Sequence, residues 1–162
     1  MAEVLDFDQL FYTAFEPKHQ HRFIMGIDGI PSYMIKGAAR PNLSFNPVEI
    51  DHINVKRKVK GKPSWASLSV TLYDPIVPSA SQALFEWIRL SHEAVTGRDG
   101  YFDMYSKDLD LWMLGPVGDI VEHWILKGAW IAAYDGGTLD WASDSLSEIQ
   151  VTLEYNYAIL EF

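Results

Sequence analysis

The side chains that most often carry chemistry are present in this sequence, but they do not form a known catalytic or metal-binding motif. His19 and His21 are two residues apart and would share one face of a strand, yet no third ligand follows at a fixed spacing. Asp103, Asp108 and Asp110 suggest an acidic metal-binding loop, but the glycine and glutamate positions of a calcium loop are missing. We therefore interpret both groups as solvated side chains.

Motifs for nucleophiles and phosphates are also missing. Serine, histidine and aspartate occur, but the sequence contains neither a Gly-x-Ser-x-Gly segment nor a glycine-rich phosphate loop. Gly136-Gly137 is predicted to lie in a hairpin turn, without a following helix to bind a phosphate. The chain has no cysteine, which excludes a disulfide, a zinc-thiolate site and a thiol nucleophile. We expect a protein that is not an enzyme and that uses no cofactor and no metal.

The six tryptophans leave carbohydrate stacking open as an alternative. Their positions within apolar patterns favour a place in the core or in an interface instead. Five of them fit this second interpretation: Trp65, Trp87, Trp124, Trp130 and Trp141.

Charge is distributed unevenly along the chain. The net charge is −9, from 13 Lys and Arg against 22 Asp and Glu. The segment Lys56–Lys62 nevertheless holds five cations, and no Lys or Arg follows Lys127. The acidic balance disfavours binding to a phosphate backbone as the main role, although contact with nucleic acid through 56–62 stays open as the weaker alternative. Copies of the chain could instead bind one another, basic segment to acidic surface.

Length and hydropathy predict one soluble domain over residues 1–162. A chain of 162 residues can bury a sizeable core without staples. No apolar run approaches the ~20 residues that span a bilayer, so we expect no membrane association. The first residues carry acids where a secretory signal would carry bases, and residues 1–20 are interpreted as an N-terminal arm ended by Pro17.

Two hairpins are predicted in the first half of the chain. Residues 22–36 alternate around Asp28-Gly29, a dipeptide that is typical of a tight turn. Residues 37–47 are interpreted as irregular connection or short edge strands. Residues 50–74 alternate again, and the segment 50–66 is predicted to be a long hairpin arm with a strongly basic tip around a turn at 61–64.

One helix is expected, over residues 79–96. Ser79 and Gln82 have the spacing of a capping box, and Gly97 is placed to end the helix. An apolar stripe lies between them, formed by Leu84, Trp87, Ile88 and Val95. Residues 98–120 hold no long period and are interpreted as an irregular excursion with one or two short strands. Two further strands follow, the first of them buried on much of both faces around Trp124 and Trp130.

The last strand is predicted from an unbroken alternation between residues 148 and 159. Its apolar positions would face a core, and its other face is hydrated and acidic. This hydrated face is formed by Glu148, Gln150, Thr152 and Glu154. The sum is a mainly antiparallel β domain with one helix, whose complementary charges suit head-to-tail contacts between copies.

Four pieces of the sequence together resemble the tail tube proteins of contractile-tailed bacteriophages. They are the hairpin Arg22–Lys36, the segment Ile53–Asp74, the helix start Ser81–Trp87, and the closing strands with Lys127-Gly128-Ala129-Trp130 and Leu139-Asp140-Trp141. The order and spacing of these pieces carry the resemblance, which spans most of residues 22–160; it is weakest in the N-terminal arm, the basic run and residues 98–122.

The resemblance implies a two-sheet barrel-like fold, hexameric rings with a 24-stranded inner barrel, and rings stacked into a tube inside a sheath. DNA would pass through the lumen at ejection without specific binding. The partners would be further copies, the tail sheath, and the baseplate and tail-terminator proteins, in a virion tail assembled in the bacterial cytoplasm. Glu148, Gln150, Thr152 and Glu154 would line the lumen, where their negative charge would repel DNA.

The basic hairpin would then reach the next ring. Its cations are predicted to meet acids there, and they are Lys56, Arg57, Lys58, Lys60 and Lys62. Three alternatives stay open: the tube of a phage-like or type VI-type injection system, a tail or baseplate adaptor that does not polymerise, and a monomeric ligand-binding barrel or enzyme with a closed apolar pocket.

Overall fold

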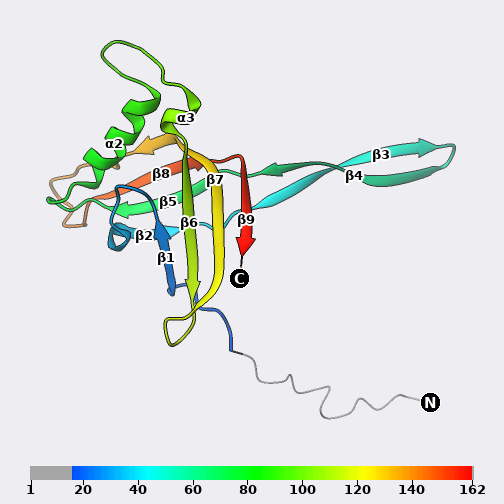
Figure 1. Cartoon of the computed structure of the whole chain (residues 1–162), viewed down its shortest axis with the longest axis horizontal. Helices are drawn as coiled ribbons and strands as arrows, with labels where there is room; N and C mark the ends of the chain where they lie inside the picture. The colour runs from blue at the N-terminus through cyan, green and yellow to red at the C-terminus, as the bar shows by residue number, and fades with distance from the viewer. Residues whose placement is uncertain (1–15, 162) are drawn as a thin grey trace.

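The computed structural model describes residues 16–161, in which two antiparallel sheets share one long strand and a separate hairpin projects from them (Figure 1). The elements follow in the order β1 (Phe23–Gly26), η1 (Ser32–Met34), β2 (Ile35–Ala38), β3 (Leu43–His52), β4 (Val55–Trp65), β5 (Leu68–Tyr73), α2 (Ala80–Ser91), α3 (Phe102–Tyr105), β6 (Lys107–Leu114), β7 (Ile120–Asp135), β8 (Glu148–Glu154) and β9 (Tyr157–Glu161). The fold is mainly β and antiparallel, as the sequence predicted.

Strand β7 belongs to both sheets. Its residues 120–129 pair with β6, and residues 123–127 also pair with β9, which gives a first sheet in the order β1-β6-β7-β9. Its residues 130–135 pair with β8, which gives a second sheet in the order β7-β8-β5-β2. The two-sheet architecture therefore depends on a strand of 16 residues that changes partners midway.

Gly128 lies where β7 passes from one sheet to the other. Its φ of +67° is a backbone conformation that L side chains rarely adopt, and an added Cβ would lie 2.4 Å from Nδ2 of Asn156. Asp108 accepts a hydrogen bond from the Gly128 amide at 3.2 Å and another from Lys127 at 2.8 Å. The Lys-Gly-x-Trp segment, residues 127–130, is thus the bend at which β7 passes from the first sheet to the second.

One hydrophobic core receives side chains from both sheets and from α2. Leu109, Leu111 and Leu126 enter it from the first sheet, and Leu84 and Trp87 enter it from the helix. The second sheet supplies a regular set on one face: Leu68, Val70, Leu72, Ile149, Val151 and Leu153. The alternation read from the sequence therefore assigns the buried face of β5 and β8 correctly.

The helix begins where it was predicted but ends earlier. The Ser79 side chain accepts a hydrogen bond from the Gln82 amide at 3.4 Å, which confirms the N-cap. The helix stops at Ser91, because the chain then folds into a small loop in which the Glu93 amide donates to Arg98 and the Gly97 amide donates to Glu93. Val95, predicted to lie on the buried stripe, is exposed in that loop.

Three strand assignments from the sequence were wrong in their partners or their extent. The Asp28-Gly29 turn forms, but β1 then pairs with β6 and β2 pairs with β5, so residues 22–36 are not one hairpin. Residues 98–120 contain β6, which lies between β1 and β7. The alternation over 148–159 is broken at Tyr155-Asn156, where the Asn156 amide donates to the Lys127 carbonyl and the chain moves to the opposite edge of β7.

Candidate functional site

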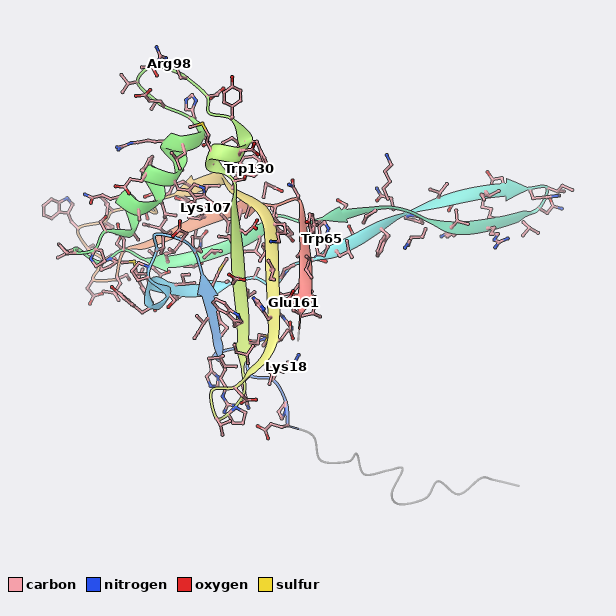
Figure 2. All side chains as sticks on the ribbon, viewed as in Figure 1. Lys18, Trp65, Arg98, Lys107, Trp130 and Glu161 are labelled. Carbon is pink, nitrogen blue, oxygen red and sulfur yellow. The ribbon has the colours of Figure 1, made fainter. Side chains whose placement is uncertain are left out.

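The most prominent feature of the described chain is a hairpin that leaves the body. Strands β3 and β4 pair only with each other within residues 16–161. At about 3.3 Å per residue, the ten residues of β3 reach roughly 33 Å. Figure 2 shows Trp65 at the base of this hairpin and side chains standing out from it along its whole length. All ten residues of β3 are exposed.

The predicted position of the turn was wrong. The hairpin spans Leu43–Trp65 with its tip at Ile53-Asn54, whereas residues 61–64 were expected to turn and residues 37–47 to be irregular connection or short edge strands. Gly61 instead lies in β4 at a shift of register, where an added Cβ would lie 2.3 Å from the Asn46 carbonyl oxygen. The glycine and proline that look like a turn in the sequence mark a bulge within a strand.

The hairpin has one charged face and one apolar face. Lys56 lies 3.4 Å from Glu49, and Lys58 lies 3.8 Å from the same carboxylate. Lys60 is 4.8 Å from the centre of the Phe45 ring. The opposite face is formed by Val48, Ile50, Val55 and Val59 together with Arg57. An alternating pattern normally buries one face, but here both faces are left to solvent.

All five cations predicted to touch a second copy lie on β4: Lys56, Arg57, Lys58, Lys60 and Lys62. Two of them are balanced by acids of β3, and no ion pair to Arg57, Lys60 or Lys62 is formed within the described chain. The hairpin from Leu43 to Trp65 therefore has a net charge of +3 in an acidic protein.

The four residues predicted to line a lumen share one face of the second sheet. Glu148, Gln150, Thr152 and Glu154 alternate with buried residues of β8. Their register partners are Tyr73, Thr71 and Ser69 on β5 and include Trp130 and Asp135 on β7, so this face combines polar side chains with aromatic rings. Glu148 is paired with Lys36 of β2. The face is mainly polar, as predicted; Asp135 adds one acid to it, and Lys36 offsets another.

A buried carboxylate that sequence reasoning missed ties the start of the described chain to the first sheet. Glu122 is 5% exposed and is bonded to Lys18 and to Nε1 of Trp124, with Arg40 3.6 Å away. Burial opposes its ionisation, but the Lys18 and Trp124 hydrogen bonds and the positive charges of Lys18 and Arg40 outweigh that effect and hold the pKa of Glu122 below its ordinary value. The signal in the sequence was the position of Glu122 itself, an acid two residues before Trp124 in a mostly apolar strand.

The predicted N-terminal arm lies mostly outside the described residues. Residues 1–15 are not described, and residues 16–22 form no regular element. His19 and His21 have ring centres 5.4 Å apart. Among residues 16–161, no group of three or more His, Asp or Glu side chains is arranged to hold a metal. Of the three loop acids, Asp108 contacts Lys127 and Asp110 contacts His123 at 2.9 Å.

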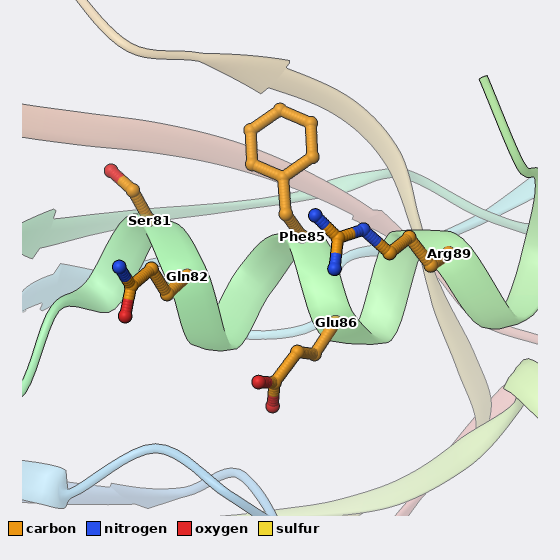
Figure 3. Close-up of a pocket in the computed structure, with 5 residues that line it drawn as sticks. All are labelled: Ser81, Gln82, Phe85, Glu86 and Arg89. Atoms are coloured by element: carbon orange, nitrogen blue, oxygen red, sulfur yellow. The ribbon is translucent and has the colours of Figure 1, made fainter. Parts of the chain in front are cut away.

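The concave places in the described chain are shallow. One hollow of about 360 Å³ lies along the outer face of α2, lined by Ser81, Gln82, Phe85, Glu86 and Arg89 (Figure 3). Its Phe85 ring packs against Tyr134 with 4.8 Å between ring centres. All its lining residues come from one helix, which leaves no converging set of groups for catalysis. No described helix has both the length and the hydropathy to cross a membrane.

The five tryptophans assigned to core or interface divide into two groups. Trp87 is buried, and Trp65, Trp124 and Trp130 are half-buried. Trp141 is fully exposed in the loop between β7 and β8, so within a single chain it has no core role.

Comparison with solved structures assigns this fold. A chain of the anti-feeding prophage cap (AFP tube terminating cap) is 18% identical with a TM-score of 0.75, over 99% of both chains. A chain of the PVC sheath/tube terminator is 16% identical with a TM-score of 0.75, over 93% of this chain and 100% of that one. A chain of the PVC sheath-tube complex is 18% identical with a TM-score of 0.70, over 90% and 91%. No family model and no curated protein matches the sequence.

The chain therefore has the tail-tube fold of contractile injection systems, which confirms the resemblance read from the sequence. A chain from a native gene transfer agent virion shares the fold at a TM-score of 0.56 and 8% identity, over 90% of this chain and all of that one. These four similar chains come from a tube terminating cap, a sheath/tube terminator, a sheath-tube complex and a virion.

Proposed function

We propose that this protein is the tube subunit of a contractile injection particle, in which rings of identical chains stack head to tail. The observation that carries the proposal is the β3–β4 hairpin, whose two faces are exposed and whose cations form no ion pair with the rest of the described chain. A surface of this kind is stabilised by a partner, and a second copy of an acidic chain supplies one of opposite charge.

The second sheet supports a ring as well. It contributes four strands, β7, β8, β5 and β2, so six copies joined edge to edge would give the 24-stranded barrel that the family resemblance implies. Glu148, Gln150, Thr152 and Glu154 would then line the lumen. The excess of acids over bases on this mainly polar face would let a polyanion such as DNA pass without binding. The chain would act with a sheath, a baseplate and a terminator, as a virion tail assembled in the bacterial cytoplasm.

The test of this proposal is negative-stain electron microscopy of the purified protein across a series of concentrations and salt. Stacked six-fold rings or tubes are expected, and they should be longest at low salt, where charges between rings are least screened. A monodisperse monomer in every condition would contradict it.

A charge reversal tests the role assigned to the hairpin. The triple change Lys56→Glu, Lys58→Glu and Lys60→Glu should abolish tube growth at low salt while leaving the fold intact, because all three side chains are exposed. The matched control is Arg89→Glu with Arg98→Glu, two exposed cations outside the hairpin, which should still form tubes. Unchanged tubes in the triple variant would remove the hairpin from the contact between rings.

A terminator or adaptor role is the second candidate, because the cap and terminator chains superpose at a TM-score of 0.75 and the sheath-tube chain at 0.70. Such a protein would remain as single rings at every concentration. The cargo is a separate question, since type VI-type and other injection systems are alternatives to a phage tail. Particles purified from a producing culture would contain nuclease-protected DNA if they are phages or gene-transfer particles, and none if they are injection systems without DNA.

A further inference from the structure

The end of the molecule opposite the hairpin carries its own unpartnered surface. Strand β4 leads from the tip into the body, and β5 continues to the far end, where Tyr73 lies beside Glu148. Two loops meet there, residues 74–79 after β5 and residues 136–147 between β7 and β8, joined by a hydrogen bond from the Asp74 amide to the Ser147 carbonyl. Figure 1 shows both loops at the end of the long axis away from β3 and β4.

These two loops expose an unusual amount of apolar surface. Trp141 and Leu139 are 106% and 93% exposed, although transfer of such large apolar side chains out of water is favourable in free energy. The apolar residues of both loops, here called the loop patch, are Ile76, Val77, Leu139, Trp141 and Leu146. The loop 138–147 also borders an open hollow of about 540 Å³, lined in part by Leu139, Trp141 and Leu146.

The charge of this end is opposite to that of the hairpin. Asp135, Asp140, Asp144 and Glu148 lie in or beside the loop, and residues 135–148 contain no Lys or Arg, for a net charge of −4. Asp135 and Asp140 accept hydrogen bonds from backbone amides of their own loop and form no ion pair within the described chain. The two ends therefore complement each other: each exposes apolar side chains, and the net charges of the two ends are opposite in sign.

The hairpin tip has a matching anchor. Ile53 is 91% exposed and has a φ of +52°, a conformation that is unfavourable for a β-branched residue. Strained backbone of this kind is often found where a side chain is held for a partner, and the exposed Ile53 side chain at the tip is in position to meet one.

We infer that the loop patch is the acceptor for the hairpin of the next copy, with Ile53 entering the hollow beside Trp141 and the cations of β4 facing Asp140 and Asp144. This inference rests on the proposed function and adds to it the surface on which a ring receives the ring behind it. Such a contact is heterologous, so each copy offers a hairpin at one end and a loop patch at the other.

The test uses two single changes that each block one end. Ile53→Asp places an acid at the hairpin tip, and Trp141→Asp places one in the loop patch. Both side chains are exposed, so both variants should fold, which circular dichroism verifies. Val95→Asp, another exposed apolar residue in the loop after α2, is the matched control and should form tubes like the parent.

Each variant alone should give single rings and no tubes. Preformed rings of the two variants, when mixed, should give stacks of two rings and nothing longer, because only one hairpin face and one loop face remain functional in each pair. Electron microscopy and mass photometry count the rings per stack.

The outcomes separate the two proposals. Tubes of normal length from Trp141→Asp would overturn the inference while leaving the tube function intact. Loss of the rings themselves in this variant would also overturn it, because the loop would then act within a ring. A parent protein that forms neither rings nor tubes would instead overturn the proposed function.

Discussion

Two antiparallel strand pairs in this molecule have similar sequence patterns and opposite environments. The β5–β8 pair covers the core with one face, and its buried residues are at most 2% exposed. The β3–β4 pair alternates in the same way, yet its apolar residues Val48, Ile50 and Val55 are all exposed. An alternating pattern thus predicts that one face of a strand pair is buried, but it does not predict whether the same chain or another chain buries it.

The largest difference is expected between matched truncations on the two strand pairs, measured as the change in the free energy of unfolding. Leu72→Ala removes a fully buried side chain and should lower the free energy of unfolding by about 2–5 kcal/mol. Ile50→Ala on the hairpin should change it by only about 0.5 kcal/mol in dispersed protein, because the Ile50 side chain is half exposed there. Chemical denaturation at high salt measures both. Equal losses would show that the hairpin is covered within its own chain.

A second prediction concerns Gly128, at the bend where β7 passes from the first sheet to the second. Gly128→Ala forces a side chain into a left-handed conformation and against Asn156, which should cost about 1–2 kcal/mol from the backbone alone. Gly37→Ala, where an added Cβ meets nothing within 4 Å, is the control. The melting temperature should fall in the first variant and stay within error in the second. The same stability in both would mean that β7 does not depend on this bend.

The third prediction uses pH. The pKa of Glu122 is lowered in the folded protein, so its contribution is present at neutral pH and is lost as the pH falls below about 4.5 and through the folded value. Glu122→Gln should therefore destabilise the protein by about 1–3 kcal/mol at pH 7 and by less in acid. Unfolding measured between pH 3 and 7 checks this. A difference between variant and parent that does not shrink in acid would contradict the assignment.

The smallest effect on the body is expected at the bulge of the hairpin. Gly61→Ala brings a Cβ against the Asn46 carbonyl oxygen, so β4 must shift locally. Because β3 and β4 pair only with each other in the described chain, the melting temperature should not change, whereas tube growth should weaken. Calorimetry and electron microscopy of the same sample separate the two readouts. A clear fall in melting temperature would show that the hairpin is coupled to the core.

The sequence predicted faces well and partners poorly. The buried positions of β8 and the N-cap at Ser79 follow from local rules, and both are confirmed. The pairing of β1 with β6 joins residues far apart in the chain, and no local pattern contains that information. The hairpin tip was missed because Ile53 is a β-branched residue that rarely adopts the positive φ of this turn, while Gly61 and Pro63 resemble turn residues within a strand.

Of the candidate site, the sequence supplied the charges and not the shape. Lys56, Arg57, Lys58 and Lys60 were expected on one strand and lie on β4, whereas Lys62 was expected in a turn and lies on the same strand; all five are exposed. Their role between rings remains a prediction. The apolar surface around Trp141 was not recognised, because a loop tryptophan looks the same in sequence whether it turns inward or outward.

Strand β7 also has a mechanical consequence. Since it runs through both sheets without a break, a force applied to the second sheet reaches the first along one continuous backbone. A pull along β7 loads the hydrogen bonds to β6, β8 and β9 in shear, so many must fail together before the sheets separate. We therefore expect the chain to transmit a force along β7 with little deformation, and the two sheets to separate in one abrupt step when the load is too high.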